Sequence, residues 1–303
     1  MNSSHRSQQY RSRFSKNSSE EPLDKDAFSP RARKSLGQHF LRSRAALVAM
    51  RDACDPTHTD IIVEVGPGDG ALTAEILPFA GKMIVIEKDS RMIPLLQEKF
   101  KKEITEGKLD IIEGDALSFD PSVLRFYKNF DYHIIGNIPY YITGALLRKF
   151  LTDAIQPTSI TFLVQKEVAE RITGGKRNRG IEEQRNKKKE SILSLSVKAY
   201  GTPEYVRTVK AGSFSPAPKV DSAILHIAQV SRKNFKNKKE EERFFEIVKT
   251  GFAQKRKTLA GNLTKLASKE NVARAFAGAG IAANARAEDV NIQKWFALRY
   301  ELD

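Results

Sequence analysis

Three alternating glycines place the strongest constraint on how this chain of 303 residues folds. The run Gly66-Pro67-Gly68-Asp69-Gly70 follows an apolar segment at 61–65 and precedes a helical pattern at 71–79. Glycines between a strand and a helix let the backbone turn tightly and let a ligand approach it closely. The spacing differs from the Gly-x-Gly-x-x-Gly of dinucleotide folds, and no Gly-Lys-Ser/Thr follows as in a P-loop. The run therefore predicts a ligand-binding turn of another kind, or, taken alone, an ordinary strand–helix turn.

Short apolar segments alternate with helical patterns on both sides of this loop. We expect strands at 61–65, 83–87, 109–112, 132–136 and 159–165, and helices at 44–53, 71–79, 90–103 and 143–153. Such alternation predicts βαβ units and a parallel sheet, which is an α/β fold. From residue 203 the pattern changes, and helices are expected at 239–254, 257–267, 270–278 and 290–299. We therefore expect a separate small helical domain there.

Acidic residues end the next two expected strands. Glu87 lies 21 residues after Gly66, where a carboxylate can accept hydrogen bonds from both hydroxyls of a ribose. Asp115 ends the third strand, where it can meet the amine edge of an adenine. Because open α/β sheets bind ligands at the carboxyl ends of their strands, these residues predict a nucleoside-containing ligand. Glu64 is expected to support the glycine loop by holding its backbone amides.

The tetrapeptide Asn137-Ile138-Pro139-Tyr140 follows the fourth expected strand and suits group transfer to the exocyclic amine of a planar base. Tyr140 supplies a flat ring for stacking. The Asn137 amide oxygen and the Ile138 carbonyl are acceptors for the protons of the amine. Pro139 restricts the backbone, which keeps donor and acceptor in line.

Taken together, these motifs resemble the KsgA family of S-adenosylmethionine-dependent dimethyltransferases of small-subunit ribosomal RNA. The resemblance covers roughly residues 34–300. It is carried by Gly37-Gln38-His39-Phe40-Leu41, Glu64-Val65-Gly66-Pro67-Gly68, Glu87, Gly114-Asp115, Asn137-Ile138-Pro139-Tyr140-Tyr141, Gln165-Lys166-Glu167-Val168 and the run from Phe214 to Ser222. It implies a Rossmann-like methyltransferase domain followed by a small helical C-terminal domain.

The resemblance also implies roles for single residues. The cofactor S-adenosylmethionine would contact His39, Leu41, Gly66, Glu87, Asp115 and Asn137. Tyr140 and Phe214 would sandwich an extruded adenine, which is methylated twice to N6,N6-dimethyladenine. Extruding that base costs a few kcal/mol of stacking.

The sequence departs from the family pattern at three places. His39 stands where many relatives have asparagine, and it could equally be a histidine of a surface loop. Tyr141 stands where asparagine is common, and it could be a packing aromatic. Residues 174–190 are unlike the usual short connection, which leaves a solvated loop or a direct phosphate contact as readings.

The net charge of +14 is unevenly distributed along the chain. Residues 1–34 and 174–192 carry +4 each and residues 203–303 carry +8, so the remainder carries −2. A basic chain suits a polyanionic partner, here ribosomal RNA of the small subunit. We expect Lys255-Arg256-Lys257 to contact phosphates, which supplies affinity rather than sequence readout. The expected domains are a tail at 1–33, a methyltransferase domain at 34–202 and a helical RNA-binding domain at 203–303.

The N-terminal tail and the single cysteine bear on the cellular setting. Residues 1–33 are poor in apolar residues, so we expect a disordered segment, with a targeting segment as the alternative. Cys54 alone excludes an intrachain disulfide framework and a multi-cysteine metal site, and no metal centre is expected. No apolar run approaches the length of a membrane span. We expect a cytoplasmic monomer.

Two other functions remain open at this point. The first is the related large-subunit methyltransferase that confers macrolide resistance, which shares the cofactor loop and the Asn-Ile-Pro-Tyr motif. The second is a non-catalytic RNA-binding or transcription factor that has kept the fold. The intact motifs argue against lost chemistry, and the run from Phe214 to Ser222 favours the small-subunit enzyme.

Overall fold

A computed structural model of the chain describes residues 33, 36–127, 131–174 and 189–302. The expected N-terminal tail therefore lies outside the described residues, except for Arg33. Most of the basic segment at 174–190 lies outside them as well. None of the described helices is long and apolar enough to cross a membrane.

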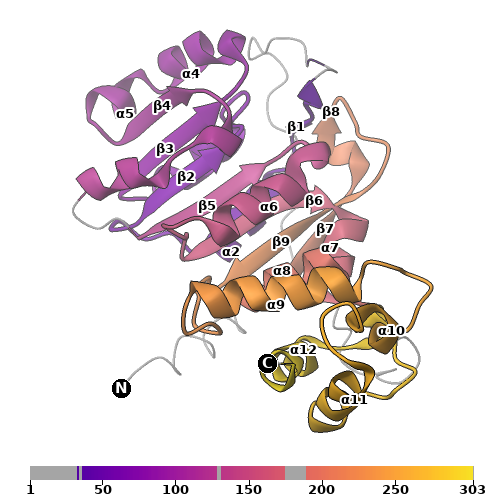
Figure 1. Cartoon of the computed structure of the whole chain (residues 1–303). Helices are drawn as coiled ribbons and strands as arrows, with labels where there is room; N and C mark the ends of the chain where they lie inside the picture. Colours follow the sequence, from indigo (N-terminus) through magenta and orange to yellow (C-terminus); the bar gives the residue numbers. More distant parts are fainter. Residues whose placement is uncertain (1–32, 34–35, 128–130, 175–188, 303) are drawn as a thin grey trace.

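A seven-stranded sheet in the order β4-β3-β2-β5-β6-β9-β7 forms the centre of the molecule (Figure 1). Its strands are β2 (Ile61–Val65), β3 (Lys82–Glu87), β4 (Leu109–Glu113), β5 (Tyr132–Asn137), β6 (Ser159–Gln165), β7 (Thr202–Val209) and β9 (Ser222–Ala228). Strands β2 to β6 pair in parallel, which confirms the expected α/β fold. Strands β9 and β7 add to β6 in antiparallel pairing.

Helices cover both faces of this sheet. In chain order these helices are α2 (Arg44–Cys54), α3 (Ala71–Ile76), α4 (Ile93–Lys99), α5 (Lys101–Thr105), α6 (Thr143–Thr152), α7 (Lys166–Thr173) and α8 (Ile192–Tyr200). Residues of α2, α3 and α4 share one buried cluster with Ile62 and Val85, whereas α6, α7 and α8 share the other with Val63 and Ile84. Neighbouring strand residues thus face opposite layers, as the period of two in a strand requires.

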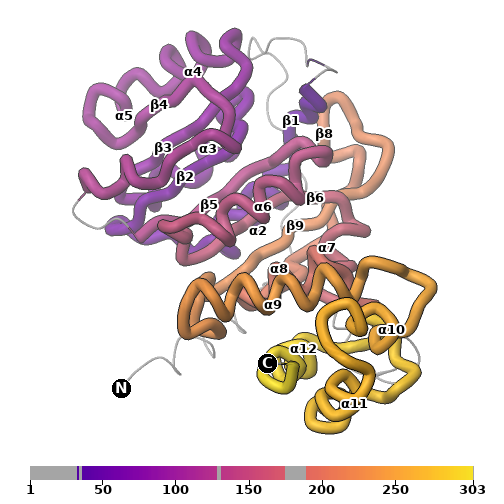
Figure 2. Tube along the Cα trace, in the orientation of Figure 1, coloured from indigo at the N-terminus to yellow at the C-terminus, as the bar shows by residue number. Residues whose placement is uncertain are grey.

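The domain boundary expected after residue 202 is wrong, because the sheet continues past it. Strands β7 and β9 lie beyond the boundary and pair with each other and with β6. Among the described residues, the helical part consists of α9 (Lys238–Gly251), α10 (Leu259–Leu263), α11 (Lys269–Gly278) and α12 (Ile292–Glu301), below the sheet in Figure 2. Their buried residues belong to the same cluster as α6 to α8, so the helical part shares a core with the sheet.

The C-terminal helices attach to the rest of the molecule through aromatic contacts. The Tyr200 ring of α8 lies 5.7 Å from both the Phe235 and Phe245 rings, centroid to centroid. Trp295 of α12 is fully buried and packs against Gly251, where an added Cβ would lie 2.5 Å from the indole. These contacts hold α9 and α12 against the layer of α8, which keeps the helical part in place relative to the sheet.

Candidate active site

The glycine loop between β2 and α3 has the backbone conformation that its glycines predict. Gly66, Gly68 and Gly70 all have positive φ angles, of 66°, 56° and 74°. A Cβ added to Gly68 would lie 2.9 Å from Cε1 of Phe40, and one added to Gly70 would lie 2.6 Å from Cε2 of Phe100. The loop therefore excludes side chains both by its left-handed conformation and by close packing.

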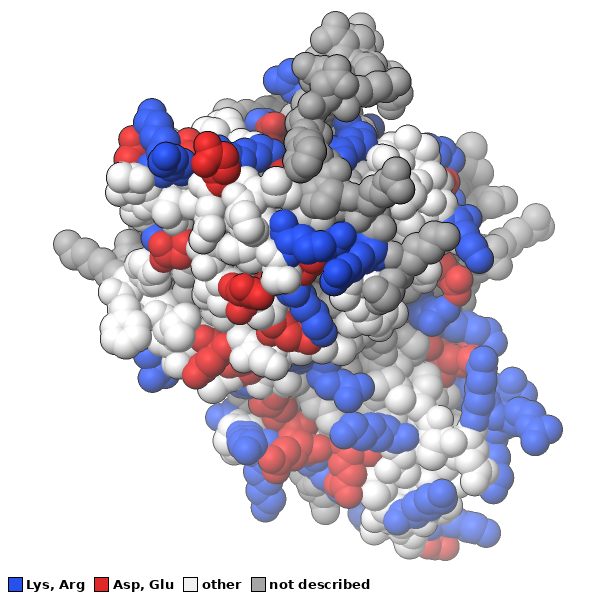
Figure 3. All heavy atoms as spheres, turned by 90° about the horizontal axis from the view of Figure 1, so that it is seen from above, with Lys and Arg blue, Asp and Glu red and all other residues white. Residues whose placement is uncertain are grey.

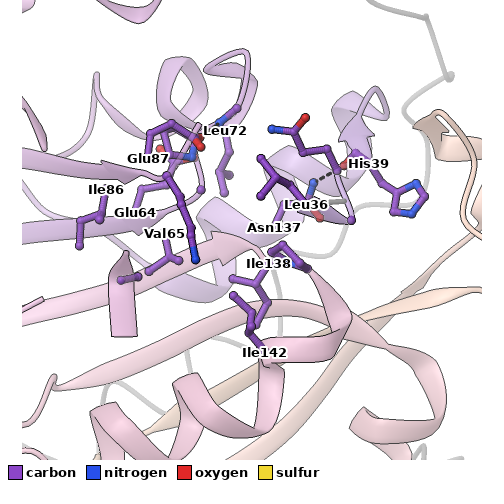
Figure 4. A pocket seen from close by; sticks show the side chains of 18 of the residues that line it. Leu36, His39, Glu64, Val65, Leu72, Ile86, Glu87, Asn137, Ile138 and Ile142 are labelled. Atoms are coloured by element: carbon purple, nitrogen blue, oxygen red, sulfur yellow. Dashed lines mark hydrogen bonds between the residues drawn. The ribbon is translucent and has the colours of Figure 1, made fainter. Parts of the chain in front are cut away.

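A cavity of about 300 Å³ lies at the carboxyl ends of β2, β3, β4 and β5. Its lining includes the glycine loop, the acidic strand ends Glu87 and Asp115, and Asn137 to Tyr140. Figure 4 shows Glu87, Asn137 and Ile138 around this cavity. A Cβ added to Gly66 would meet no atom within 4 Å, so the space in front of this backbone is open. An extended nucleoside cofactor needs such a cradle, which fits the group expected from the sequence.

Glu87 fastens the glycine loop from the neighbouring strand. Its carboxylate accepts hydrogen bonds from the Gly68 amide at 3.0 Å and from the Asp89 amide at 2.7 Å. The side chain lines the cavity while the residue is only 5% exposed, and burial raises its pKa above the ordinary value. Glu87 thus combines a fixed orientation with a face toward the ligand space.

Glu64 has a different partner from the one expected. Its carboxyl accepts a hydrogen bond of 2.6 Å from the hydroxyl of Thr73 in α3. Among the described residues, no amide of the glycine loop donates a hydrogen bond to Glu64. Burial raises the pKa of Glu64 to about 8. At neutral pH the carboxyl is therefore largely protonated, and the loop amide is held by Glu87 instead.

Asp115 lies where β4 leads into a short helical turn. Its carboxylate accepts the Leu117 amide at 2.9 Å and the Lys88 ammonium at 2.8 Å. The hydrogen bond from Lys88 lowers the pKa of Asp115, so the carboxylate is ionised. Lys88 also lines the cavity, and its pairing with Asp115 lies at the edge where an adenine amine is expected.

The motif after β5 presents one amide group and one ring to the cavity. Asn137 Nδ2 donates a hydrogen bond of 2.7 Å to the His39 carbonyl, which leaves its Oδ1 available as an acceptor (Figure 4). The hydroxyl of Tyr140 shares a hydrogen bond of 2.6 Å with Ser222. A Cβ on Gly136 would lie 2.6 Å from the Val65 carbonyl, so β5 approaches β2 closely at this point.

A segment near the N-terminus, residues 36–42, lies over the cavity and is held at several points. Strand β1 (Phe40–Leu41) pairs with β8 (Phe214–Ser215). Gln38 donates to Asp89 at 3.0 Å, and Arg42 pairs with Asp69 of the glycine loop at 2.5 Å. These contacts fix residues 36–42 against the glycine loop and β8. Leu41 lines the cavity and is buried.

Asp89 and Arg42 were missed by the sequence reasoning, although both organise this site. Asp89 receives a two-point contact from Arg91 besides the bond from Gln38, and its pKa is lowered to about 2. The Gln38–Asp89 and Arg42–Asp69 pairs join positions 51 and 27 residues apart, and only the place of Asp89 two residues after Glu87 was a signal for it. Nothing local in the sequence pairs Arg42 with the glycine loop.

Two sets of expected residues are not brought to the cavity. Phe214 is 6% exposed and packs in the core cluster with Phe40 and Leu41, and it is not among the cavity's lining residues. The expected stacking of a base between Tyr140 and Phe214 stays a prediction. Lys255, Arg256 and Lys257 are exposed on the turn between α9 and α10, in the half of Figure 1 away from β1 and β8.

Comparisons with known proteins agree with this geometry. A family model described as "Ribosomal RNA adenine dimethylase" matches residues 29–303. "Ribosomal RNA small subunit methyltransferase A" of Dehalococcoides mccartyi is 37% identical over 278 residues, with 91% of this chain and 90% of the relative covered. The protein of the same name from Clostridium botulinum is 34% identical, with 86% and 90% covered.

Solved structures show the same fold. The 23S rRNA methyltransferase ErmE superposes with a TM-score of 0.70 at 25% identity, covering 87% of this chain and 99% of that one. A dimethyladenosine transferase from Plasmodium falciparum superposes with a TM-score of 0.65 at 25% identity, covering 86% and 96%. The fold is thus found in an enzyme named for 23S rRNA and in one named as a dimethyladenosine transferase.

Proposed function

The chain belongs to the ribosomal RNA adenine dimethylase family, and on this premise we propose that it dimethylates the N6 amine of adenines in small-subunit ribosomal RNA, with S-adenosylmethionine as the methyl donor. One observation carries the proposal. The amide of Asn137, the ring of Tyr140 and the acidic strand ends Glu87 and Asp115 line a single cavity beside an open glycine loop.

The residues of the cavity fit the proposed cofactor. The Glu87 carboxylate lines the cavity, where it can accept hydrogen bonds from the ribose hydroxyls. The Asp115 carboxylate accepts a hydrogen bond from Lys88 and can accept another from the adenine amine. The space in front of the Gly66 backbone is open, and the segment that contains His39 and Leu41 lines the same cavity. When bound, S-adenosylmethionine supplies a methyl group on a positively charged sulfur, which makes that carbon electrophilic.

Asn137 and Ile138 then act on the adenine amine. The lone pair of this nitrogen is delocalised into the ring, so the amine is a poor nucleophile. Hydrogen bonds from its two protons to Asn137 Oδ1 and to the Ile138 carbonyl favour a pyramidal nitrogen whose lone pair points at the methyl group. The methyl group would pass from the sulfur of the bound cofactor to this nitrogen, and one N–H proton would then leave for solvent. Positioning and charge stabilisation account for most of the acceleration.

The small-subunit assignment rests on the relatives rather than on the fold. The fold is shared with an enzyme named for 23S rRNA at 25% identity, whereas relatives named for the small subunit reach 37% over 91% of the chain. The macrolide-resistance alternative is therefore not favoured. We propose that the protein works as a monomer in the cytoplasm, where small subunits are assembled.

Exposed cations can hold the RNA on both parts of the molecule. Lys88, Lys210 and Lys219 are exposed, and Lys88 lines the cavity itself. Figure 3 shows a group of lysine and arginine side chains near the centre of the face seen from above. We propose that Lys88, Lys210 and Lys219, together with Lys255 to Lys257, contact phosphates and position the RNA without reading its bases.

Methylation of each purified ribosomal subunit tests the proposal. The protein and labelled S-adenosylmethionine are incubated with unmodified small or large subunits, and the RNA is digested and separated. We expect label in N6,N6-dimethyladenine from the small subunit. Label confined to the large subunit would favour the macrolide-resistance alternative, and RNA binding without any label would favour a non-catalytic factor.

A further inference from the structure

Tyr141, the residue directly after the Asn-Ile-Pro-Tyr motif, is an exposed aromatic residue at the edge of the cavity. It lines the cavity together with Tyr140, but 67% of its surface is exposed. Tyr140 is half-buried, and its hydroxyl shares a hydrogen bond with Ser222. A ring as exposed as that of Tyr141 does not fill a core, so Tyr141 is not the packing aromatic that the sequence allowed.

One edge of the Tyr141 ring is supported by the covering segment at 36–42. A Cβ added to Gly37 would lie 3.4 Å from Cε1 and 3.6 Å from Cδ1 of Tyr141. The backbone at Gly37 therefore lies close to this edge of the ring, and the residue remains mostly exposed. A tyrosine has only two side-chain torsions, so a ring supported in this way binds a flat partner at a low cost in conformational entropy.

The helix that follows leaves open space beside the ring. Tyr141 lies in the short helical turn that leads into α6, so the residues three and four positions later lie on the same side of the helix. These residues are Gly144 and Ala145, which are small and exposed. A Cβ added to Gly144 would meet no atom within 4 Å. A planar group can therefore approach Tyr141 without displacing a side chain of α6.

Lys88 places a positive charge near this ring. The pKa of Lys88 is raised, chiefly by its hydrogen bond to Asp115 and to a smaller extent by the charge of Tyr141. Lys88 is exposed and lines the cavity, and the bond to Asp115 uses one of the three N–H donors of its ammonium group. Aromatic rings beside cations hold single-stranded nucleic acids, because each base stacks on a ring while the backbone lies along the positive charges.

We propose that Tyr141 is a stacking surface for a base that adjoins the target adenine in the RNA. The inference rests on the proposed function, because the RNA is the one whose adenine that function methylates. Extruding an adenine leaves its neighbours without a stacking partner, and the ring of Tyr141 replaces that partner for one of them. Tyr140 and Tyr141 are consecutive, so a nucleotide next to the one at Tyr140 can reach Tyr141. The expected stacking of the target base on Tyr140 and Phe214 is unaffected.

Four variants test the inference. Tyr141→Ala removes the ring, Tyr141→Phe keeps it, and Tyr141→Leu keeps apolar volume without a ring. Gly144→Leu fills the open space beside the ring, because side chains in a helix point back toward its N-terminus. The matched control is Phe126→Ala, since Phe126 is 91% exposed and is not among the lining residues of the cavity.

For each variant we measure kcat and KM for unmodified small subunits and the dissociation constants of small subunits and of S-adenosylmethionine. A base stacked on an aromatic ring is worth about 5- to 140-fold in affinity. We expect Tyr141→Ala to raise KM and the RNA dissociation constant by a factor in that range, with cofactor affinity within about twofold. Tyr141→Phe should behave as the parent, whereas Tyr141→Leu and Gly144→Leu should show part of the loss.

The outcomes separate this inference from the proposed function. A parent protein that methylates no ribosomal RNA would overturn the proposed function, and the inference with it. With an active parent, a Tyr141→Ala variant that binds RNA as well as Phe126→Ala does would overturn the inference alone. A loss of S-adenosylmethionine affinity as large as the loss of RNA affinity would also overturn it, because the ring would then cover the cofactor. If Tyr141→Ala does not fold, RNA affinity equal to the parent's in Gly144→Leu would overturn it.

Discussion

Asn137 shows how a single amide acquires a defined chemical role. Its nitrogen is engaged by the His39 carbonyl at 2.7 Å, so the oxygen is the end that remains for a substrate. An amide oxygen held in this way does not need to reorganise when an amine approaches, which is the condition for efficient electrostatic stabilisation. The sequence motif predicted the residue, but the partner that orients it lies 98 positions away and has no local signal.

Replacing Asn137 with Ala should separate chemistry from binding. The variant loses the acceptor for the amine proton, and we expect kcat to fall about 10²- to 10³-fold while RNA affinity stays within about twofold. Single-turnover methylation and a filter-binding titration measure the two quantities. Unchanged turnover would contradict the role given to Asn137.

Glu64 should make the free energy of unfolding depend on pH above neutrality. Its pKa is raised by burial from 4.5 to about 8, so the folded state keeps a proton that the unfolded state has lost. Stability from this group is therefore full below pH 4.5 and is lost as the pH rises toward 8. Relative to the parent, Glu64→Gln should gain stability between pH 6 and pH 9, as measured by urea unfolding.

The exposed Glu113, at the end of β4, provides the matched control for Glu64. Glu113→Gln should shift the unfolding midpoint by the same small amount at every pH in this range. If Glu64→Gln behaved in the same way, Glu64 would be ionised in the folded protein at neutral pH.

At the scale of the element, the glycine loop depends on space as well as on backbone conformation. Gly68 has a φ of 56° and lies under the ring of Phe40, so the loop and the covering segment at 36–42 fit against each other. The Glu87 carboxylate also accepts a hydrogen bond from the Gly68 amide. The loop is thus held between two elements, and a change in it affects both.

Gly68→Ala should lower both the free energy of unfolding and the affinity for S-adenosylmethionine. A left-handed alanine costs about 1–3 kcal/mol of stability, and the added Cβ also displaces Phe40. Gly107→Ala is the matched control, because Gly107 has a φ of 71° but open space around its Cβ position. We expect a larger loss of stability in Gly68→Ala than in Gly107→Ala, because only the first displaces Phe40, and a loss of S-adenosylmethionine affinity only in Gly68→Ala. Calorimetric titration measures it, and equal affinities would contradict this account.

The elements that the sequence predicted are those with local patterns. Strands β2 to β6 were expected within one or two residues, and β2, β3 and β6 are nearly continuous apolar runs because they are buried on both faces. Strand β7 was missed because it is an edge strand with alternating exposure, a proline at 203 and a bulge near Tyr205. Its pairing with β9 is a long-range contact that no short window reveals. The covering pair β1 and β8, only two residues each, was missed for the same reason.

For the whole molecule, the charge and the chemistry are carried by different segments. The residues outside 1–34, 174–192 and 203–303 hold −2 of the net charge of +14, and they contain most of the cavity. The exception is the β9 side of the site, because Ser222 bonds Tyr140 from beyond residue 203. The shared core of sheet and C-terminal helices then fixes the exposed basic turn at 255–257 relative to the cavity.

Replacing Lys255, Arg256 and Lys257 together with Ala should reduce RNA affinity and its salt dependence. Each lost phosphate contact lowers the slope of log K against log salt by about one, so a decrease of about two to three is expected. The matched control removes the exposed Lys101, Lys102 and Lys108 near α5, at the opposite corner of Figure 1. A control with the same decrease in slope would show that net charge, rather than this turn, holds the RNA.

Mass spectrometry of the RNA decides whether this cavity dimethylates adenine in small-subunit RNA. Unmodified small subunits are incubated with S-adenosylmethionine and either the parent protein or the Asn137→Ala variant, and the digested RNA is analysed for methylated adenosines. We predict N6,N6-dimethyladenosine with the parent protein and none above background with the variant. No dimethyladenosine with the parent protein, or the same amount with the variant, would contradict the account.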